Sequence, residues 1–390
     1  MTKFKMLPLT GNQAIAEAMR QVNPDVVAAY PITPQSAIVE TFSKFVADGK
    51  VDTEMVRVES EHSALSAVVG ASLTGARAMT ATCSAGLALM WEIVGVASGL
   101  RCPIVMAVAN RALSAPINIH CDHSDSMGAR DLSWIQIYCE NAQEAYEMVL
   151  LALRLAEHPD VMLPVMVCED GFITSHCVQN VKIHDDSDVR KFVGERRSEH
   201  NLFDFRHPVT IGAIELQDYY FESKRQQQEA MKNALKVYLE TGKELSKLTG
   251  NDYGYFEKYR IDGAEAIIIT MSSSAGTAKT VVDRMRNEGK KVGLLKIRLF
   301  RPFPYEEVKE AIKGVKAIGV LDRSFSFGAN APLFSEVKNA LFDMEKRPKV
   351  QSYVFGLGGR DLLEEHVEYA FKELLEGKLT GKEKYLGLRE

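Results

Sequence analysis

The sequence has few cysteines, and none of them form a metal-binding pair. Its 390 residues include 6 cysteines and no CxxC motif. The cysteines are Cys83, Cys102, Cys121, Cys139, Cys168 and Cys177. Local iron–sulfur and zinc motifs depend on closely spaced cysteines, and so does a small disulfide scaffold. We therefore expect no metal site made by one local cysteine motif, and we expect reduced thiols.

Long apolar runs and an excess of charge of one sign are also lacking. The longest apolar region, residues 85–100, contains Glu92 and is shorter than the roughly 20 residues of a membrane span. The first residues have no apolar core typical of a signal peptide, which predicts a cytoplasmic protein. Lys and Arg number 47 against 52 Asp and Glu, for a net charge of −5. This balance disfavours nucleic acid and anionic membranes as partners.

The sequence contains alternating helical and strand patterns, which predict an α/β fold. In the first half, apolar strand runs at 25–30, 56–60, 78–83, 103–109 and 163–170 alternate with helical patterns. Strands of this kind predict a doubly wound parallel sheet covered on both faces. Residues 180–258 are polar and predict a connector with one amphipathic helix. Dense alternation resumes afterwards, so we expect a first domain at 1–258 and a smaller α/β domain at 259–390.

Ligands of parallel sheets bind beyond the carboxyl ends of the strands, so these junctions are candidate sites. Thr33 lies between prolines in AYPITPQS, and Glu61 opens a helix after VES. The string TATCSAGLALM at 80–90 offers small residues. Each of these three also has a simpler interpretation. The Thr33 segment could be a turn that ends a strand, Glu61 could belong to a helix cap, and residues 80–90 could allow tight packing of a helix on the sheet.

Arg111 comes directly after an apolar strand and begins a long irregular stretch, residues 109–134. Loops of this length within a domain are usually functional, and an arginine there suits a carboxylate ligand. The same stretch carries a possible divalent-metal set, which the absence of helical i, i+4 spacing disfavours. That set is His120, Asp122, His123 and Asp125.

Familiar nucleotide and nucleophile motifs are absent. GLGGRD at 356–361 and MSSSAG at 271–276 lack the GxxxxGK[ST] and GxGxxG patterns, which favours glycine-rich turns and disfavours a nicotinamide or nucleotide enzyme. No GxSxG occurs, which argues against a serine hydrolase.

Six strings, in order, carry a family resemblance: AYPITP, VESEHSA, NRALSAPINI, DHSDSMGARD, IRLFRPFP and GLGGRD. Together they resemble the α subunit of 2-oxoacid:ferredoxin oxidoreductases, most closely those acting on pyruvate. The resemblance covers nearly the whole chain. It implies a pyrimidine-type thiamine diphosphate-binding domain, followed by a transketolase C-terminal-like domain that lies far from the thiamine ring and serves assembly.

The resemblance also assigns roles. Glu61 is expected to hydrogen-bond the cofactor's pyrimidine ring and so favour its imino form, which takes the proton from the thiazolium carbon; Glu59 is the competing candidate. Thr33 is expected to contact substrate and cofactor, and Arg111 to bind the substrate carboxylate. The remaining cofactor-binding residues are expected to be Pro31, Ile32, Ser84 and Gly86.

A dicarboxylic substrate would want a second cation near Arg111, whereas the adjoining loop offers Asp122 and Asp125. This favours pyruvate over 2-oxoglutarate or oxalate, with branched 2-oxoacids left open. The expected reaction is oxidative decarboxylation of pyruvate with coenzyme A to acetyl-CoA and carbon dioxide, with electrons leaving to ferredoxin. A non-catalytic assembly subunit is the alternative from another class, and the joint presence of Thr33, Glu61 and Arg111 disfavours it.

The sequence has no GDG followed by Asn, the family signature for Mg²⁺ and diphosphate, and no cluster-binding cysteine set. The resemblance therefore implies a β subunit that carries the diphosphate site, Mg²⁺ and a [4Fe-4S] cluster. It also implies γ and ferredoxin-like δ subunits. No metal site is expected in this chain.

Overall fold

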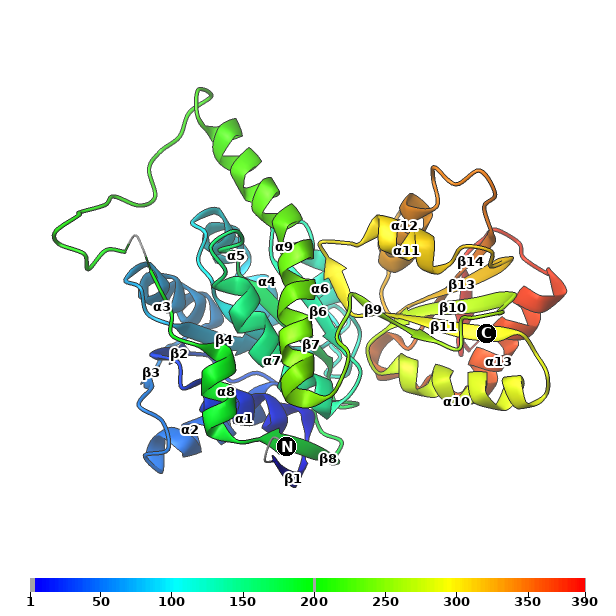
Figure 1. Cartoon of the computed structure of the whole chain (residues 1–390), viewed down its shortest axis with the longest axis horizontal. Coiled ribbons are helices and arrows are strands. Elements are labelled where there is room, and N and C mark those ends of the chain that lie inside the picture. Colours follow the sequence, from blue (N-terminus) through cyan, green and yellow to red (C-terminus); the bar gives the residue numbers. More distant parts are fainter. Residues whose placement is uncertain (1–3, 199–200, 390) are drawn as a thin grey trace.

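The computed structural model describes residues 4–198 and 201–389. Two sheet-centred units lie side by side, joined by a long helix and a short strand (Figure 1). Both units contain parallel strands with helices on their faces, so the predicted α/β class is confirmed.

The first sheet has seven strands in the order β12-β6-β7-β5-β4-β2-β3. Its parallel strands are β2 (Val26–Ala28), β3 (Glu54–Val56), β4 (Ala78–Thr82), β5 (Val105–Asn110), β6 (Ile135–Cys139) and β7 (Val165–Asp170). The central strands β4, β5 and β7 are buried along their whole length, as expected for a sheet covered on both faces.

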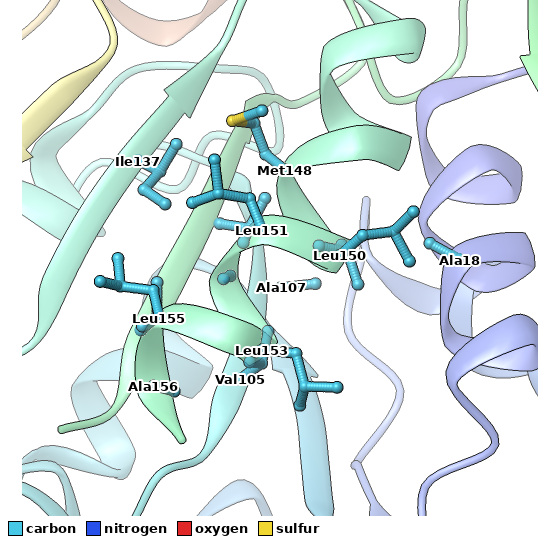
Figure 2. Packing of buried hydrophobic residues seen from close by; sticks show 14 of the residues in the cluster. Ala18, Val105, Ala107, Ile137, Met148, Leu150, Leu151, Leu153, Leu155 and Ala156 are labelled. Atoms are coloured by element: carbon cyan, nitrogen blue, oxygen red, sulfur yellow. The ribbon is translucent and has the colours of Figure 1, made fainter. Parts of the chain in front are cut away.

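Helices cover both faces of this sheet. One face carries α1 (Gly11–Val22), α2 (Ser36–Ala47) and α7 (Ala142–Ala156), and the other carries α3 (Glu61–Leu73), α4 (Ser84–Leu89) and α5 (Trp91–Gly99). Helix α7 is buried nearly all round because it packs between the sheet, α1 and the later helix at residues 220–249. Figure 2 shows Leu151 and Leu155 directed toward the strands and Leu150 toward Ala18 of α1.

Two details of the first unit differ from the sequence prediction. The strand expected at 56–60 ends at Val56, because Ser60 caps α3 by accepting a hydrogen bond from the Ser63 amide at 3.2 Å. The irregular stretch at 109–134 contains the short helix α6 (Ser124–Gly128), and it is followed by strand β6, which the prediction missed.

The polar segment after residue 178 is more structured than a connector with one helix. It begins with β8 (Gln179–His184), which pairs antiparallel with β1 (Phe4–Leu9), and continues into α8 (Asp186–Val193). The 30-residue helix α9 (Tyr220–Thr249) then packs on α7. Its inner face is buried because apolar residues recur at helical spacing, at Ala230, Ala234, Val237, Tyr238 and Leu245.

The second sheet has the order β15-β14-β13-β10-β11-β9. Its strands are β9 (Phe256–Tyr259), β10 (Ala266–Met271), β11 (Val292–Ile297), β13 (Ala317–Asp322), β14 (Lys349–Phe355) and β15 (Lys384–Leu386). All pairs are parallel except that of β9 with β11. Its helices are α10 (Ser274–Asn287), α11 (Tyr305–Ala311), α12 (Pro332–Ala340) and α13 (Glu364–Glu376), with the 3-10 turn η1 (Leu357–Gly359) after β14.

The run KVGLLKIRLFRPFP is divided between the two sheets. β11 stays in the second sheet, whereas β12 (Leu299–Arg301) joins the edge of the first sheet and pairs antiparallel with β6. The division falls at Arg298, whose guanidinium binds the buried Glu144 of α7 at 2.9 Å. One buried apolar cluster includes Tyr138 of β6, Phe300 of β12 and Ile269 of β10, so the core is continuous across both units.

Among residues 4–198 and 201–389, no helix combines the length and apolar content needed to cross a membrane. Five of the cysteines are buried and Cys177 is exposed.

Candidate active site

The carboxyl ends of β2, β4 and β5 lie next to one another in the sheet, and the segments that follow them form the candidate site. Thr33 follows β2, Ser84 follows β4 and Arg111 follows β5. Glu61 opens α3, the helix after the edge strand β3. Four residues widely spaced in the sequence are thereby placed at one edge of the sheet.

The Thr33 turn is held by side chains of other segments that bind its carbonyl groups. The carbonyl of Thr33 accepts hydrogen bonds from Arg111 Nη1 at 2.9 Å and from the Cys83 thiol at 3.2 Å. The buried Asn12 side chain donates to the carbonyl of Pro34 at 2.9 Å. Pro31 and Thr33 are exposed, and Ile32 is partly buried. The turn therefore presents the Thr33 side chain to the outside while its backbone is fixed from below.

The guanidinium of Arg111 is buried and oriented by two carbonyl groups. Nε donates to the carbonyl of Asn118 at 2.9 Å, and Nη1 donates to that of Thr33. Nη2 makes no hydrogen bond with any residue in the described part of the chain. Two fixed donors set the plane of the guanidinium, which leaves the third nitrogen available for an anionic ligand.

Asp125 organises the backbone between Ser84 and Arg111. Its carboxylate accepts hydrogen bonds from the Ser84 amide at 2.9 Å and the Arg111 amide at 3.0 Å. It also accepts from Asn110 Nδ2 at 2.8 Å and the Ser126 amide at 2.7 Å. Burial raises the pKa of Asp125, although these hydrogen bonds act in the opposite direction. Because its oxygens accept four hydrogen bonds from the segments around it, Asp125 positions the backbone of the loop.

The possible metal set in the loop does not form one cluster. Asp122 accepts from the Ser124 amide, and His123 Nε2 lies 2.7 Å from Asp170. Two other groups among the described residues bring metal-ligand atoms within 4.8 Å of one another: Cys121–His123–Asp170 and Glu140–Glu144–Glu257. Each already binds a cation of the chain, since Arg323 Nη1 lies 3.2 Å from Asp170 and Lys296 Nζ contacts all three glutamates.

Glu61 is the buried carboxylate of the site. Glu61 is the first residue of α3 and is 7% exposed, and its carboxylate makes no hydrogen bond with any described residue. The neighbouring Thr82 Oγ1 is also buried without a partner. Gly86 lies against both: a Cβ atom there would be 2.6 Å from Thr82 Oγ1 and would also contact Glu61. Because Gly86 has no side chain, the Glu61 carboxylate has room to lie beside it.

The competing residue Glu59 is placed differently. It is exposed, and its carboxylate accepts a hydrogen bond from the Ser63 hydroxyl, which lowers its pKa. This bond supports the first turn of α3.

Both the amide and the hydroxyl of Ser84 make hydrogen bonds within the chain. Its amide donates to Asp125, and its hydroxyl donates to the carbonyl of Ala112 at 2.6 Å. Its φ of +46° turns the chain sharply between β4 and α4. Ser84 therefore joins the strand end to the Arg111 loop.

Cys83 lies at the centre of the group, and the sequence did not single it out. Burial, aided by Asp125 and Glu61, raises the pKa of its thiol to about 12, so it stays protonated at neutral pH. Asn12 and Asn110 were missed as well. The available signal was a polar side chain at a strand or helix end within otherwise apolar sequence.

Known proteins of one family match most of the chain. Residues 17–243 match the family described as pyruvate flavodoxin/ferredoxin oxidoreductase, thiamine diphosphate-binding, which is more than half of the chain. The chain belongs to this family. Residues 264–367 match a second model from pyruvate:ferredoxin oxidoreductase, core domain II. The family resemblance inferred from the sequence is thus confirmed.

Members of the pyruvate ferredoxin oxidoreductase family match over most of the chain. Pyruvate synthase subunit PorA of Thermotoga maritima is 57% identical and covers 98% of both chains. Ketoisovalerate oxidoreductase subunit VorA of Pyrococcus abyssi is 44% identical, over 90% of this chain and 89% of its own. Among solved structures, a 2-oxoglutarate:ferredoxin oxidoreductase from Magnetococcus marinus superposes with a TM-score of 0.75 at 20% identity. It covers 95% of this chain and 65% of that one, and at this identity it shows the fold alone.

The site fits the aminopyrimidine end of thiamine diphosphate, the cofactor for which the matched family domain is described. A buried carboxylate and a buried hydroxyl without partners lie beside a glycine. An unpaired buried carboxylate is costly unless a donor completes it, and a ring nitrogen with its proton is such a donor.

Proposed function

We propose that this chain is the α subunit of a pyruvate:ferredoxin oxidoreductase. The reaction is the thiamine-dependent oxidative decarboxylation of pyruvate with coenzyme A to acetyl-CoA and carbon dioxide, and two electrons pass to ferredoxin. The match at 57% identity to a pyruvate synthase subunit, over 98% of both chains, carries this proposal.

Three residues of this chain bind the cofactor and the substrate. Glu61 holds the aminopyrimidine ring through a hydrogen bond to a ring nitrogen. Arg111 binds the substrate carboxylate with the guanidinium nitrogen that the protein leaves free. Thr33, exposed on a turn whose backbone is fixed, orients the substrate beside the cofactor. The cofactor, when bound, would supply carbanion-stabilising chemistry for decarboxylation of a 2-oxoacid.

A second candidate substrate is a branched 2-oxoacid. The 44% match to a ketoisovalerate oxidoreductase subunit favours it over larger dicarboxylic substrates. Pyruvate and a branched 2-oxoacid share the carboxylate and the ketone, so Arg111 and Thr33 would serve both.

The chain works as part of a complex in this proposal. A β subunit carries the diphosphate half of the site, Mg²⁺ and a [4Fe-4S] cluster, and γ and δ subunits relay electrons. Exposed apolar side chains support such assembly: Trp91, the first residue of α5, is 50% exposed, and Phe205, in the segment before α9, is 84% exposed. Within the chain we place the division between the pyrimidine-type domain and the transketolase C-terminal-like domain at residues 258 and 259.

The test is purification from the native source, identification of co-purifying chains, and an anaerobic assay of viologen reduction with a panel of 2-oxoacids. We expect coenzyme A-dependent reduction with pyruvate and a complex of several chains. Arg111→Ala should raise KM for pyruvate about 10- to 100-fold, because a charged hydrogen bond to the carboxylate is lost. A preference for 2-oxoglutarate, or a lone inactive chain without thiamine, would contradict the proposal.

A further inference from the structure

The second unit touches the loop that carries Arg111. The turn Gly356–Gly359, which follows β14 and includes η1, lies against residues 118–121. Asn118 Nδ2 donates to the carbonyl of Gly358 at 3.1 Å, and the amide of Gly359 donates to the carbonyl of Cys121 at 2.7 Å. These glycines belong to GLGGRD, the string predicted to form a glycine-rich turn.

The fit between the turn and the loop leaves no room for side chains. A Cβ atom on Gly358 would lie 2.3 Å from Asn118 Nδ2, and one on Gly359 would lie 2.3 Å from the Cβ of His120. Both glycines also have positive φ, of 60° and 82°. The loop therefore packs directly on the backbone of the second unit.

The same loop residues hold Arg111. The carbonyl of Asn118 accepts from Arg111 Nε at 2.9 Å, and the carbonyl of His120 accepts from the Ala112 amide at 3.0 Å. One residue, Asn118, thus contacts the glycine turn with its side chain and the guanidinium with its main chain.

A buried group at His123 provides a second contact between the loop and the second unit. Arg323, directly after β13, places Nη1 3.2 Å from Asp170 at the end of β7. The carbonyl of Arg323 accepts from the His123 amide at 2.9 Å, and His123 Nε2 lies 2.7 Å from Asp170. The loop is therefore held at both 118–121 and 123.

We propose that the 356–359 turn is a positioning element for substrate binding. By fixing Asn118 and His120, it sets the plane of the Arg111 guanidinium and so sets the affinity for the 2-oxoacid. A planar guanidinium binds a carboxylate well only in a fixed orientation, so a small displacement is costly. The inference rests on the proposed role of Arg111. It gives the second unit a part in substrate binding beyond the assembly role that the family resemblance implied.

Gly359→Ala in the complete complex is the test. The added methyl group displaces the loop at His120, and we expect KM for pyruvate to rise roughly 10- to 100-fold. We expect kcat and KM for coenzyme A to change less than about twofold, because neither depends on how Arg111 binds the substrate carboxylate. The matched control is Gly314→Ala, which has a similar φ of 84° and open space around its Cβ. It carries the same backbone strain without touching the loop, so KM should not change.

Asn118→Ala is the second variant, and it decides the question if Gly359→Ala does not fold. It adds no atom and removes both side-chain hydrogen bonds of Asn118, the one donated to Gly358 and the one accepted from the His120 amide at 2.7 Å. It should raise KM for pyruvate in the same direction. The double variant Arg111→Ala/Gly359→Ala should have the KM of Arg111→Ala alone, because both changes act through one group.

The outcomes separate the two proposals. If Arg111→Ala leaves KM unchanged, the substrate role of Arg111 fails, and the positioning role fails with it. If Arg111→Ala raises KM but Gly359→Ala and Asn118→Ala do not, only the positioning role is overturned. An equal rise in KM for Gly314→Ala, or a fall in kcat with KM unchanged, would also overturn it.

Discussion

A Cβ atom on Gly86 would lie 2.7 Å from Oε1 of Glu61, so the glycine at the start of α4 and the carboxylate at the start of α3 share one space. Gly86→Ala should push Glu61 out of place. Because catalytic groups tolerate little displacement, we expect kcat to fall roughly 10²-fold, measured by pyruvate-dependent viologen reduction.

The matched control for that variant is Gly70→Ala in α3, where an added Cβ meets nothing within 4 Å. Alanine favours a helix over glycine, so this variant should be at least as stable as the wild type and equally active. Wild-type turnover in Gly86→Ala would show that Glu61 does not need this space.

Glu61→Gln tests the carboxylate itself. The amide keeps the shape but not the charge, and a positioned proton-transfer partner typically contributes 10²–10⁴ in rate. We expect kcat to fall by about that factor, with an unchanged melting temperature. Glu59→Gln serves as control, since Glu59 is exposed and bonded to Ser63. If Glu59→Gln proves the more damaging change, the two roles have been assigned the wrong way round.

Asp125→Asn should loosen the Arg111 loop. The carboxylate accepts from the amides of Ser84, Arg111 and Ser126 and from Asn110, whereas an asparagine has one acceptor oxygen and brings its own donors. We expect a loss of about 1–3 kcal/mol in the free energy of unfolding, together with a raised KM for pyruvate. Asp131→Asn on the exposed side of the loop is the comparison; equal stability of the two variants would argue against the role of Asp125.

Asp322 predicts a pH dependence. It caps α12 by accepting from the amides of Leu333 at 2.7 Å and Phe334 at 3.1 Å, and burial raises its pKa to about 7. An unfolded aspartate titrates near 3.9, so from about pH 4 to 7 the folded chain binds the extra proton and its stability falls as pH rises.

The measurement is the melting temperature of the wild type and Asp322→Asn at about pH 5.5 and about pH 8. The variant cannot titrate, so its melting temperature should gain on that of the wild type as pH rises. Parallel pH curves for the two proteins would contradict the raised pKa.

Much of the architecture could be predicted from local pattern. Buried strands such as AMTAT and VMAVAN are apolar throughout, which is the mark of a covered parallel sheet, and the α/β class followed from them. Strand β6 was missed because IQIYC follows a long polar loop, and it is recognisable as a strand only beside β7 and β12. The break at Arg298 was missed for a related reason, since Glu144, which binds it, is more than 150 residues away in the chain.

The sequence by itself determined the family, the α/β fold and the candidates Thr33, Glu61 and Arg111, because these depend on short strings whose order can be read directly. Only the tertiary structure decided how those residues are held. Glu61 is buried whereas Glu59 is exposed, and Asp125 accepts hydrogen bonds from the backbone amides of Ser84 and Arg111. Contacts between distant segments place the 356–359 turn against the Arg111 loop. Burial and long-range contacts depend on which strands become neighbours in the sheet, and the spacing of residues within a short stretch of sequence does not predict that order.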